Sequence, residues 1–463
     1  MSEKASERLL NQKKNGYDRI SPQERQEMID YCEEYKRFLA VGCTERECVE
    51  EILRMARERG YREFKRGDSI QPGDKLFRVE GKKSVILAVI GNQPMEQGAV
   101  ICGAHIDNPR LDLKPNPLYE DSGSVARFKT HYYGGIRKYQ WVSIPLALHG
   151  VVYRSNGEAV QVRIGDEPGD PQLTIPDLLP HLADKQAKEP LWQAIKGEDL
   201  NVLVGSEPYA DQEEKERIKL QVMELLNEKY GITEYDFNTA ELCVVPAFRP
   251  TDIGLDRSMV GAYGQDDRVC AFASLKALFD AKGTLNRTGI CLLTDKEEIG
   301  SFGITGMDSS YFDRFFEDLC RADGSDYLTC IENSLCLSCD VTAAYDDNFA
   351  FAYDKYNAGR WNGGVGVCKY TGSRGKSGAS DASAELLSYA RQVLDADGVI
   401  WHVCELGKVD EGGGGTIAHY MARRGLPTLD MGTPLLAMHA PFEVSAKLDC
   451  YMTYRAARAF YQS

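Results

Sequence analysis

The stretch Thr294-Asp-Lys-Glu-Glu-Ile-Gly-Ser-Phe-Gly303 is the most informative part of the chain, because it places two adjacent carboxylates, Glu297 and Glu298, directly after an apolar run. That run, Gly289-Ile-Cys-Leu-Leu-Thr294, has the length and composition of a buried strand. Open α/β sheets carry their chemistry at the carboxyl ends of such strands. One acid could hold a metal ion while its neighbour moves a proton. Seen alone, the pair is equally well explained as the acidic first turn of a helix.

Four further segments place ligand-type side chains at strand ends or tight turns. Imidazole and carboxylate groups are the usual ligands of zinc-like ions, and a single carboxylate can bridge two cations about 3.5 to 4 Å apart. Together with the first stretch, these segments predict a two-metal hydrolase centre. They are Gly103-Ala-His105-Ile-Asp107, Gly264-Gln-Asp266-Asp267-Arg268, Ser338-Cys-Asp340 and Ala437-Met-His439-Ala.

Each segment also has a purely structural explanation. Asp107 could cap a turn, and Asp266 and Asp267 are favourable N-cap and first-turn acids for the apolar helix that follows them. Asp340 could cap the segment after its strand, and a lone histidine such as His439 is more often a hydrogen-bonded core residue. Capping explains any one of these residues, but it does not explain why all of them occur together.

Alternating helix and strand signals predict the fold class. Ser21-Pro-Gln-Glu24 and Thr44-Glu-Arg-Glu47 are capping boxes that start two helices, and the last helix is expected to begin at Glu443. The pattern predicts an α/β fold with a mostly parallel sheet flanked by helices. The expected strands are 84–90, 99–102, 288–293, 335–339, 399–404 and 427–430, and the other expected helices are 268–281, 309–321, 382–394 and 416–424.

The middle of the chain has a different sequence pattern. Short β-rich stretches such as Gly150-Val-Val-Tyr153 and Ala159-Val-Gln-Val-Arg-Ile164 are broken by Gly, Asn and Pro. We therefore predict an inserted β-rich domain at residues 116–246, within a catalytic domain formed by residues 1–115 and 247–463.

Composition excludes several classes of partner. The chain has 463 residues and a formal net charge of -15, from 55 basic and 70 acidic side chains. This balance provides no basic surface for nucleic acid or anionic lipid. No apolar stretch approaches the roughly 20 residues that span a bilayer, and the polar stretch Met1 to Asn15 has no signal-peptide core. We expect a cytoplasmic protein with neither nucleic acid nor membrane as a partner.

Most of the fourteen cysteines lie singly inside apolar runs, as Cys102 and Cys243 do. Such residues behave as small buried hydrophobes, so reduced thiols are expected. Cys336-Leu-Ser-Cys339 has the spacing of redox and zinc sites, yet no second pair completes a four-thiolate zinc set. The sequence leaves the role of Cys336 and Cys339 open.

In order and local sequence, the five segments resemble the aspartyl aminopeptidase family of cocatalytic dinuclear metallopeptidases, in its bacterial branch of probable aminopeptidases. The resemblance covers nearly the whole chain, because that family also inserts a β-rich dimerisation domain between the first His segment and the bridging Asp. It implies a dinuclear zinc aminopeptidase-like catalytic domain that removes single N-terminal residues from short peptides.

The resemblance also implies roles for the candidate residues. Two divalent metal ions per subunit are expected. Zinc is the default expectation, and cobalt and manganese are alternatives for a mixed oxygen and nitrogen ligand set. Glu297 would be the general base that takes a proton from the attacking water and later hands it to the leaving amine, and Asp107 would orient His105. The implied ligands are His105, Asp266 and Asp340 for one metal, and Asp266, Glu298 and His439 for the other.

A preference for acidic N-terminal residues, for which the family is named, requires cations in the pocket for the first residue. Arg374 and Lys376 are the candidates for this contact. Two departures put a strict preference for Asp or Glu in question. Gly375 aligns with the lysine of the eukaryotic branch, and Tyr139 stands where that branch has a histidine that reaches a neighbouring subunit.

The resemblance further implies a homo-oligomer in which dimers assemble into a tetrahedral dodecamer that encloses the active sites. Two rival functions stay open at this point. One is a dinuclear-metal amidohydrolase or deacylase of small amidated substrates, and the other is a non-catalytic binding protein with this fold. The sequence disfavours the second, because no ligand position or base has been lost, and the large insert favours a peptidase over the first.

Overall fold

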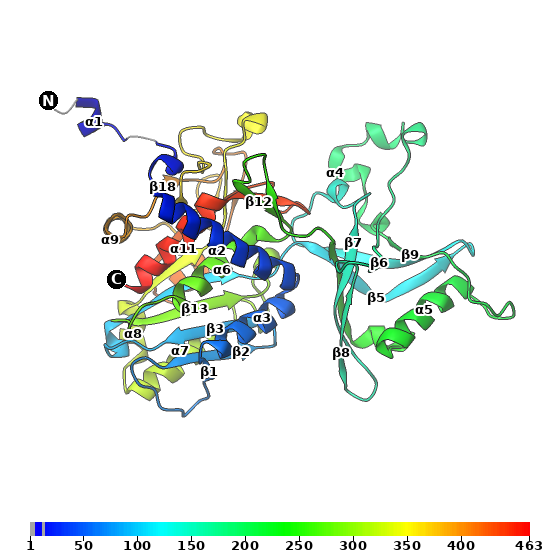
Figure 1. Ribbon diagram of the computed structural model, residues 1–463, viewed down its shortest axis with the longest axis horizontal. Helices are drawn as coiled ribbons and strands as arrows, with labels where there is room; N and C mark the ends of the chain where they lie inside the picture. Colours follow the sequence, from blue (N-terminus) through cyan, green and yellow to red (C-terminus); the bar gives the residue numbers. More distant parts are fainter. Residues whose placement is uncertain (1–4, 12–13) are drawn as a thin grey trace.

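The computed structural model describes residues 5–11 and 14–463, so residues 1–4 and 12–13 of the polar N-terminal stretch lie outside the described residues. Figure 1 shows two lobes that meet along one side. The larger lobe has a central sheet with helices on both faces, and the smaller lobe is built on a separate sheet.

The larger lobe contains a nine-stranded sheet whose centre is parallel. The neighbours β13, β4, β14 and β20 all run in the same direction, and every residue of β4, β13 and β14 is buried, as expected for strands covered on both faces. The predicted mostly parallel sheet is therefore confirmed. In spatial order the strands are β1 (Arg62–Glu63), β2 (Lys75–Glu80), β3 (Ser84–Val89), β13 (Thr288–Thr294), β4 (Ala99–His105), β14 (Leu335–Cys339), β20 (Thr428–Gly432), β16 (Val365–Cys368) and β18 (Trp401–Cys404).

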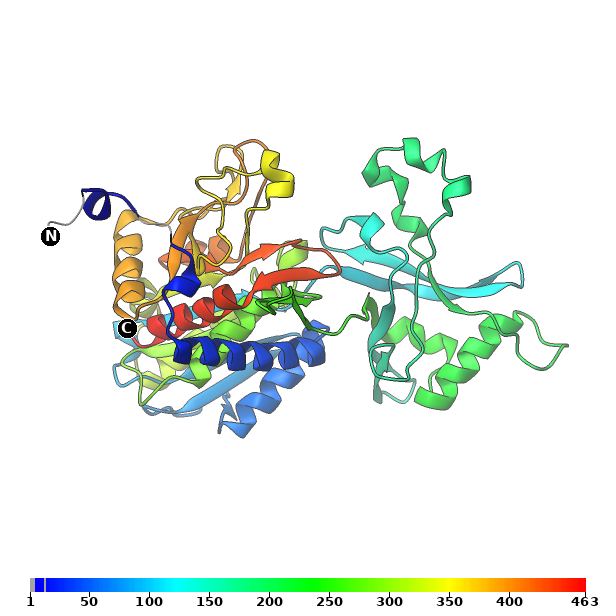
Figure 2. The same ribbon diagram turned by 45° about the horizontal axis from the view of Figure 1, so that its top comes forward.

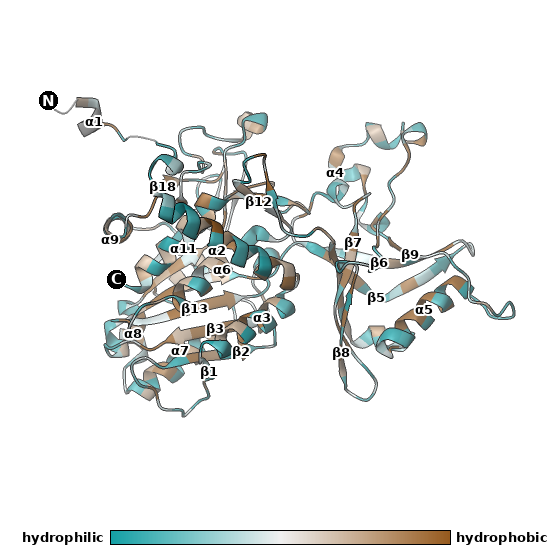
Figure 3. Ribbon diagram, in the orientation of Figure 1, coloured by the Kyte–Doolittle hydropathy of each residue, from teal (hydrophilic) through white to brown (hydrophobic). Residues whose placement is uncertain are grey.

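Helices cover both faces of this sheet. One face carries α2 (Pro22–Val41), α3 (Glu45–Glu58), α6 (Gln265–Phe279), α9 (Ala384–Ala396) and α11 (Lys447–Tyr461), and the other carries α7 (Tyr311–Asp323), α8 (Tyr327–Asn333) and α10 (Ala418–Arg423). The short α1 (Ala5–Leu9) precedes them. Figure 2 shows α11 lying alongside α2, and Figure 3 shows that the strands of the main sheet are largely hydrophobic.

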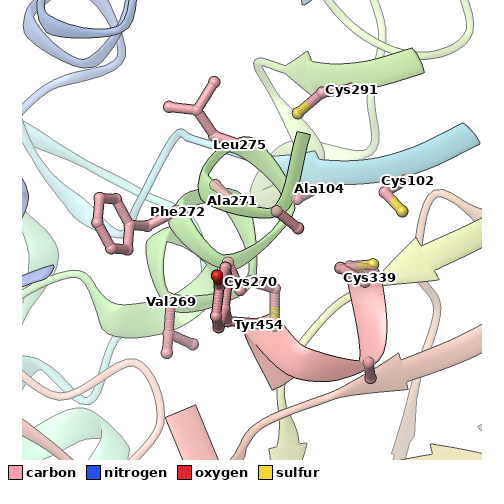
Figure 4. Close-up of a cluster of buried hydrophobic side chains, with 14 of the residues drawn as sticks. Cys102, Ala104, Val269, Cys270, Ala271, Phe272, Leu275, Cys291, Cys339 and Tyr454 are labelled. Atoms are coloured by element: carbon pink, nitrogen blue, oxygen red, sulfur yellow. The ribbon is translucent and has the colours of Figure 1, made fainter. Parts of the chain in front are cut away.

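The most buried helix, α6, packs on β4. Figure 4 shows Ala271 of α6 on the side of the helix that faces Ala104 of β4, with Phe272 on the other side of the helix. Cys336 and Cys339 of β14 belong to the hydrophobic cores on opposite faces of the sheet. Both thiols are buried, so this pair fills the two cores and does not point toward one common site.

The smaller lobe is built on a six-stranded antiparallel sheet with its own hydrophobic core. The helix α5 (Arg217–Tyr230) packs on this sheet and ends at Gly231, which has the left-handed conformation (φ 64°) that favours glycine. A short helix, α4 (Leu191–Ala194), lies in the same lobe. In spatial order the strands are β8 (Ala159–Ile164), β7 (Leu146–Tyr153), β10 (Ala240–Pro246), β5 (Arg110–Asp121), β6 (Val125–Tyr133) and β9 (Val202–Gly205).

A five-stranded sheet lies beside the N-terminus of α6 and corrects one prediction. Glu443 does not begin the last helix, because residues Glu443–Ala446 form β22 and α11 begins at Lys447. The four residues of β22 pair with β12 in antiparallel register, so this long-range pairing overrides the local helix signal. The strands are β11 (Thr251–Ile253), β12 (Met259–Ala262), β22, β21 (Pro434–Leu436) and β15 (Thr342–Ala343), and a separate two-stranded ladder joins β17 (Gly372–Ser373) to β19 (Gly413–Gly414).

Other local predictions are confirmed. Ser21 and Thr44 both form complete capping boxes at the starts of α2 and α3. Among the described residues, no helix combines the length and the apolar character needed to cross a membrane.

Candidate metal centre

The carboxyl ends of three neighbouring strands bring three of the predicted segments together. His105 is the last residue of β4, and it pairs in register with Thr294, the last residue of β13. The 3-10 helix η8 (Glu297–Ile299) follows β13, and Asp340 follows β14 directly. Because β13, β4 and β14 are parallel neighbours, these side chains meet at one edge of the sheet.

The other two segments approach the same edge from the α6 side. Asp266 lies at the start of α6 in a non-helical conformation, and the peptide bond between Asp266 and Asp267 is cis. His439 follows β21 in a turn. Glu443 joins the two segments, because its carboxylate accepts hydrogen bonds from the backbone amides of Gln265, at 2.6 Å, and His439, at 2.7 Å.

The distances among these side chains fit metal coordination. His105 Nε2 lies 3.2 Å from Asp266 Oδ1, and His439 Nε2 lies 3.2 Å from Asp266 Oδ2. His439 Nε2 is 3.5 Å from Glu298 Oε2, and His105 Nε2 is 4.0 Å from Asp340 Oδ1. Two ligand atoms on one tetrahedral zinc ion lie about 3.3 Å apart. Since each oxygen of Asp266 faces a different histidine, this carboxylate has the placement of a bridging ligand.

The electrostatics of the cluster also favour a bound cation. Burial raises the pKa of Asp340 and of Glu298 well above the ordinary carboxyl value, and nearby carboxylates raise both further. Burial raises the pKa of Glu297 to about 7. Glu298 Oε1 is buried and has no hydrogen-bond partner. A divalent cation would offset this carboxylate repulsion and give the unpartnered oxygen a ligand role, so the residues present fit a metal site.

Asp107 contacts both the His105 ring and the backbone of Glu297 and Glu298. His105 Nδ1 lies 3.1 Å from the Asp107 carbonyl oxygen and 3.3 Å from its Oδ1. The same carboxylate accepts hydrogen bonds from the backbone amides of Glu297, at 3.1 Å, and Glu298, at 3.2 Å. Asp107 is fully buried, so it is placed to hold the His105 ring and the two glutamates in fixed positions.

A cavity of about 500 Å³ opens onto the centre. The candidate ligands and Glu297 line it, together with uncharged groups that include Thr342, Leu406, Met438 and the glycines of 413–415. Among the described residues, no lysine or arginine lines this cavity.

The two predicted substrate cations lie outside the cavity lining. Arg374 is exposed on the loop 371–380. Lys376 Nζ lies 3.7 Å from the ring centroid of Tyr370, which does line the cavity, and 3.2 Å from Asp381 Oδ2. Of the two, Lys376 has a direct contact with the cavity wall.

Sequence reasoning missed three groups that contact the centre. Glu443 was assigned only to the start of a helix, although its buried carboxylate holds the backbone of two site segments. In the insert, Tyr133 donates a hydrogen bond to Asp107, and the Gly135 carbonyl lies 2.9 Å from His439 Nδ1. The glycine pair that follows Tyr133 was the only local signal of a close backbone approach.

Comparison with known proteins identifies the protein family of this chain. Residues 38–461 match the family model described as aminopeptidase I zinc metalloprotease (M18). A probable M18 family aminopeptidase 1 from Clostridium acetobutylicum is 45% identical over 461 residues, which are 98% of each chain. The corresponding protein of Thermotoga maritima is 44% identical over 441 residues, or 94% of this chain and 96% of the relative.

Solved structures agree with this assignment. The crystal structure of an M18 aminopeptidase from Thermotoga maritima has a TM-score of 0.93 at 42% identity, covering 98% of this chain and 99% of that one. Aminopeptidase I from Clostridium acetobutylicum has a TM-score of 0.92 at 43% identity, covering 98% and 100%. These matches set aside the deacylase and the non-catalytic alternatives. The chain belongs to the M18 family of zinc metalloproteases and is a metal-dependent aminopeptidase.

Proposed function

We propose that the enzyme uses two divalent metal ions, bound on either side of Asp266, to remove single N-terminal residues from short peptides. Zinc is the metal that we expect first. The observation that carries this proposal is the pair of 3.2 Å distances from the two Asp266 oxygens to two different histidines. The ligands would be His105, Asp266 and Asp340 on one side, and Asp266, Glu298 and His439 on the other.

Bound cations would supply Lewis acidity for the scissile carbonyl and lower the pKa of the attacking water. Glu297 lines the cavity, and its Oε2 lies 4.0 Å from His105 Nε2, beside the first ligand group. In this position its carboxylate takes the proton of the attacking water and returns it to the leaving amine. Asp107 holds the backbone of Glu297 and the ring of His105 during both transfers.

Metal removal tests this proposal. Thorough chelation is expected to lower hydrolysis of aminoacyl-nitroanilides by about a thousandfold or more, because no side chain of the cavity can replace the cations. Zinc, cobalt or manganese should restore activity, and the same chelator saturated with zinc beforehand serves as the control. Undiminished hydrolysis by protein shown to be metal-free would contradict the proposal.

We propose further that Lys376 provides a preference for acidic first residues. Its ammonium rests on the Tyr370 ring at the cavity wall, and its long side chain reaches the cavity by a change of rotamer. Lys376→Met is expected to lower the ratio of kcat/KM for glutamyl over leucyl substrates by about tenfold, the effect of one charge-assisted hydrogen bond. Arg374→Met should change this ratio less. An unchanged ratio in both variants would contradict the assignment.

We propose that residues 116–246 form a dimerisation domain and that dimers assemble into a tetrahedral dodecamer. A solved structure with this fold, mApe1 of S. cerevisiae, is a dodecamer, with a TM-score of 0.75 at 19% identity. A largely apolar cavity of about 660 Å³ on the smaller lobe, lined by Leu203, Val204 and Leu225 among others, offers surface for a second copy. Light scattering should give about twelve times the 51.6 kDa of one chain. A monomer would contradict the proposal.

A further inference from the structure

The end of β6 and the turn that follows it bring residues of the smaller lobe into contact with the candidate metal centre. The Tyr133 hydroxyl donates a hydrogen bond to Asp107 Oδ2 at 2.8 Å. Two residues later, the Gly135 carbonyl oxygen lies 2.9 Å from His439 Nδ1. One short segment of the smaller lobe therefore contacts a partner of His105 and a ligand on the opposite side of Asp266.

The Tyr133 ring is fixed from the side of the smaller lobe. Tyr133 pairs in register with Arg110 across β5 and β6, and the Arg110 guanidinium lies 4.1 Å from the centroid of the tyrosine ring. Arg110 is itself held by Glu45, at 3.0 Å, and Asp112, at 2.7 Å. With the guanidinium held by two carboxylates and the ring stacked against it, the hydroxyl has little freedom to leave Asp107.

The Tyr133 hydroxyl is one of three hydrogen-bond donors that orient the Asp107 carboxylate. Its Oδ2 accepts hydrogen bonds from the Tyr133 hydroxyl and the Glu298 amide, and its Oδ1 accepts one from the Glu297 amide. Loss of the hydroxyl would leave Oδ2 with the long 3.2 Å contact to the Glu298 amide alone. The carboxylate could then rotate, and with it the support for the His105 ring.

The glycines after Tyr133 let the backbone approach the ligands closely. A Cβ atom on Gly135 would lie 3.2 Å from His439 Nδ1, and one on Gly134 would lie 3.4 Å from Glu298 Oε2. Because the Gly135 carbonyl can only accept a hydrogen bond, His439 Nδ1 carries a proton, which leaves Nε2 as the nitrogen that would bind a metal ion. The segment thus approaches two residues of the second proposed ligand set, Glu298 and His439, without a side chain in between.

We propose that Tyr133 is a positioning residue of the aminopeptidase centre, which acts through Asp107 to hold His105 and the two glutamates in metal-binding geometry. The inference rests on the proposed dinuclear metal centre. It also gives the smaller lobe a part in catalysis that is separate from oligomerisation.

Tyr133→Phe tests the proposal, because it removes the hydroxyl and keeps the ring on Arg110. The zinc dissociation constant, measured on metal-free protein by competition with a chromophoric chelator, is expected to rise by about 10- to 100-fold. In the zinc-saturated enzyme, kcat should fall by about tenfold or more while KM stays within about twofold, since Tyr133 does not contact the substrate. Tyr132→Phe, the half-exposed neighbour, is the matched control and should match the wild type in both measurements.

A double-mutant cycle separates this role from simple packing. If Tyr133 acts through Asp107, then Tyr133→Phe added to Asp107→Asn should change the zinc dissociation constant by less than about twofold. If Tyr133→Phe weakens zinc binding as much in the Asp107→Asn background as in the wild type, then Tyr133 does not act through Asp107, and the proposal is overturned.

The remaining outcomes are equally decisive. Wild-type zinc affinity and kcat in Tyr133→Phe would contradict the inference while leaving the metal centre intact. A rise in KM alone would make Tyr133 a substrate contact and would also contradict it. Failure of the wild-type protein itself to bind zinc would refute the proposed centre, and the role of Tyr133 with it.

Discussion

Glu297→Gln is expected to lower kcat by about a thousandfold while the enzyme keeps all of its bound metal. The amide has nearly the volume of the carboxylate but cannot accept a proton from water at neutral pH, and general-base catalysis contributes about 10²- to 10⁴-fold. The backbone amide of residue 297 donates a hydrogen bond to Asp107, at 3.1 Å, so the substitution should leave the neighbouring proposed ligand Glu298 in place.

The measurement combines steady-state kinetics on an aminoacyl-nitroanilide with metal analysis of the same sample. Glu332→Gln, an exposed glutamate on α8, is the matched control and should retain full activity and full metal content. A Glu297→Gln enzyme with kcat within about tenfold of the wild type would refute the role of Glu297 as the base.

Asp266→Asn should have a still larger effect, with loss of metal from both sides of the centre and of activity by about 10⁴-fold or more. Each Asp266 oxygen faces a different histidine Nε2 at 3.2 Å. An asparagine offers one oxygen and one NH₂ group, and the NH₂ group cannot ligate a cation. The variant therefore could not bridge the two proposed cations, and it would also remove the negative charge that they would share.

Metal analysis after dialysis against zinc at a fixed free concentration checks this expectation. Asp184→Asn, an exposed aspartate in the smaller lobe, is the control for an Asp to Asn change that leaves the centre untouched. Wild-type metal content in Asp266→Asn would exclude a bridging role for Asp266 and would require another pairing of the ligands.

The convergence of the site could be predicted because its residues follow strands whose character is visible locally. Apolar runs of strand length end at His105, before Glu297 and before Asp340, and parallel neighbours necessarily end at the same sheet edge. Capping boxes at Ser21 and Thr44 are equally local, since the signal lies within four residues.

The contacts that support the proposed ligands could not be predicted, because they join residues far apart in the chain. The Gly135 carbonyl and the His439 ring are 304 residues apart, and no periodicity relates them. Glu443 looked like the acidic start of a helix, whereas pairing of β22 with β12 makes it a buried strand residue that holds Gln265 and His439. The loop that carries Arg374 and Lys376 has no repeating pattern that could fix its position relative to the cavity.

The most direct test of the central claim is anomalous scattering at the zinc absorption edge from crystals grown with zinc. Two peaks are expected, about 3.5 to 4 Å apart, on either side of the Asp266 carboxylate. One should lie within about 2.0 to 2.2 Å of ligand atoms of His105 and Asp340, and the other within the same distance of Glu298 and His439. A single peak, or peaks away from these five residues, would contradict the account.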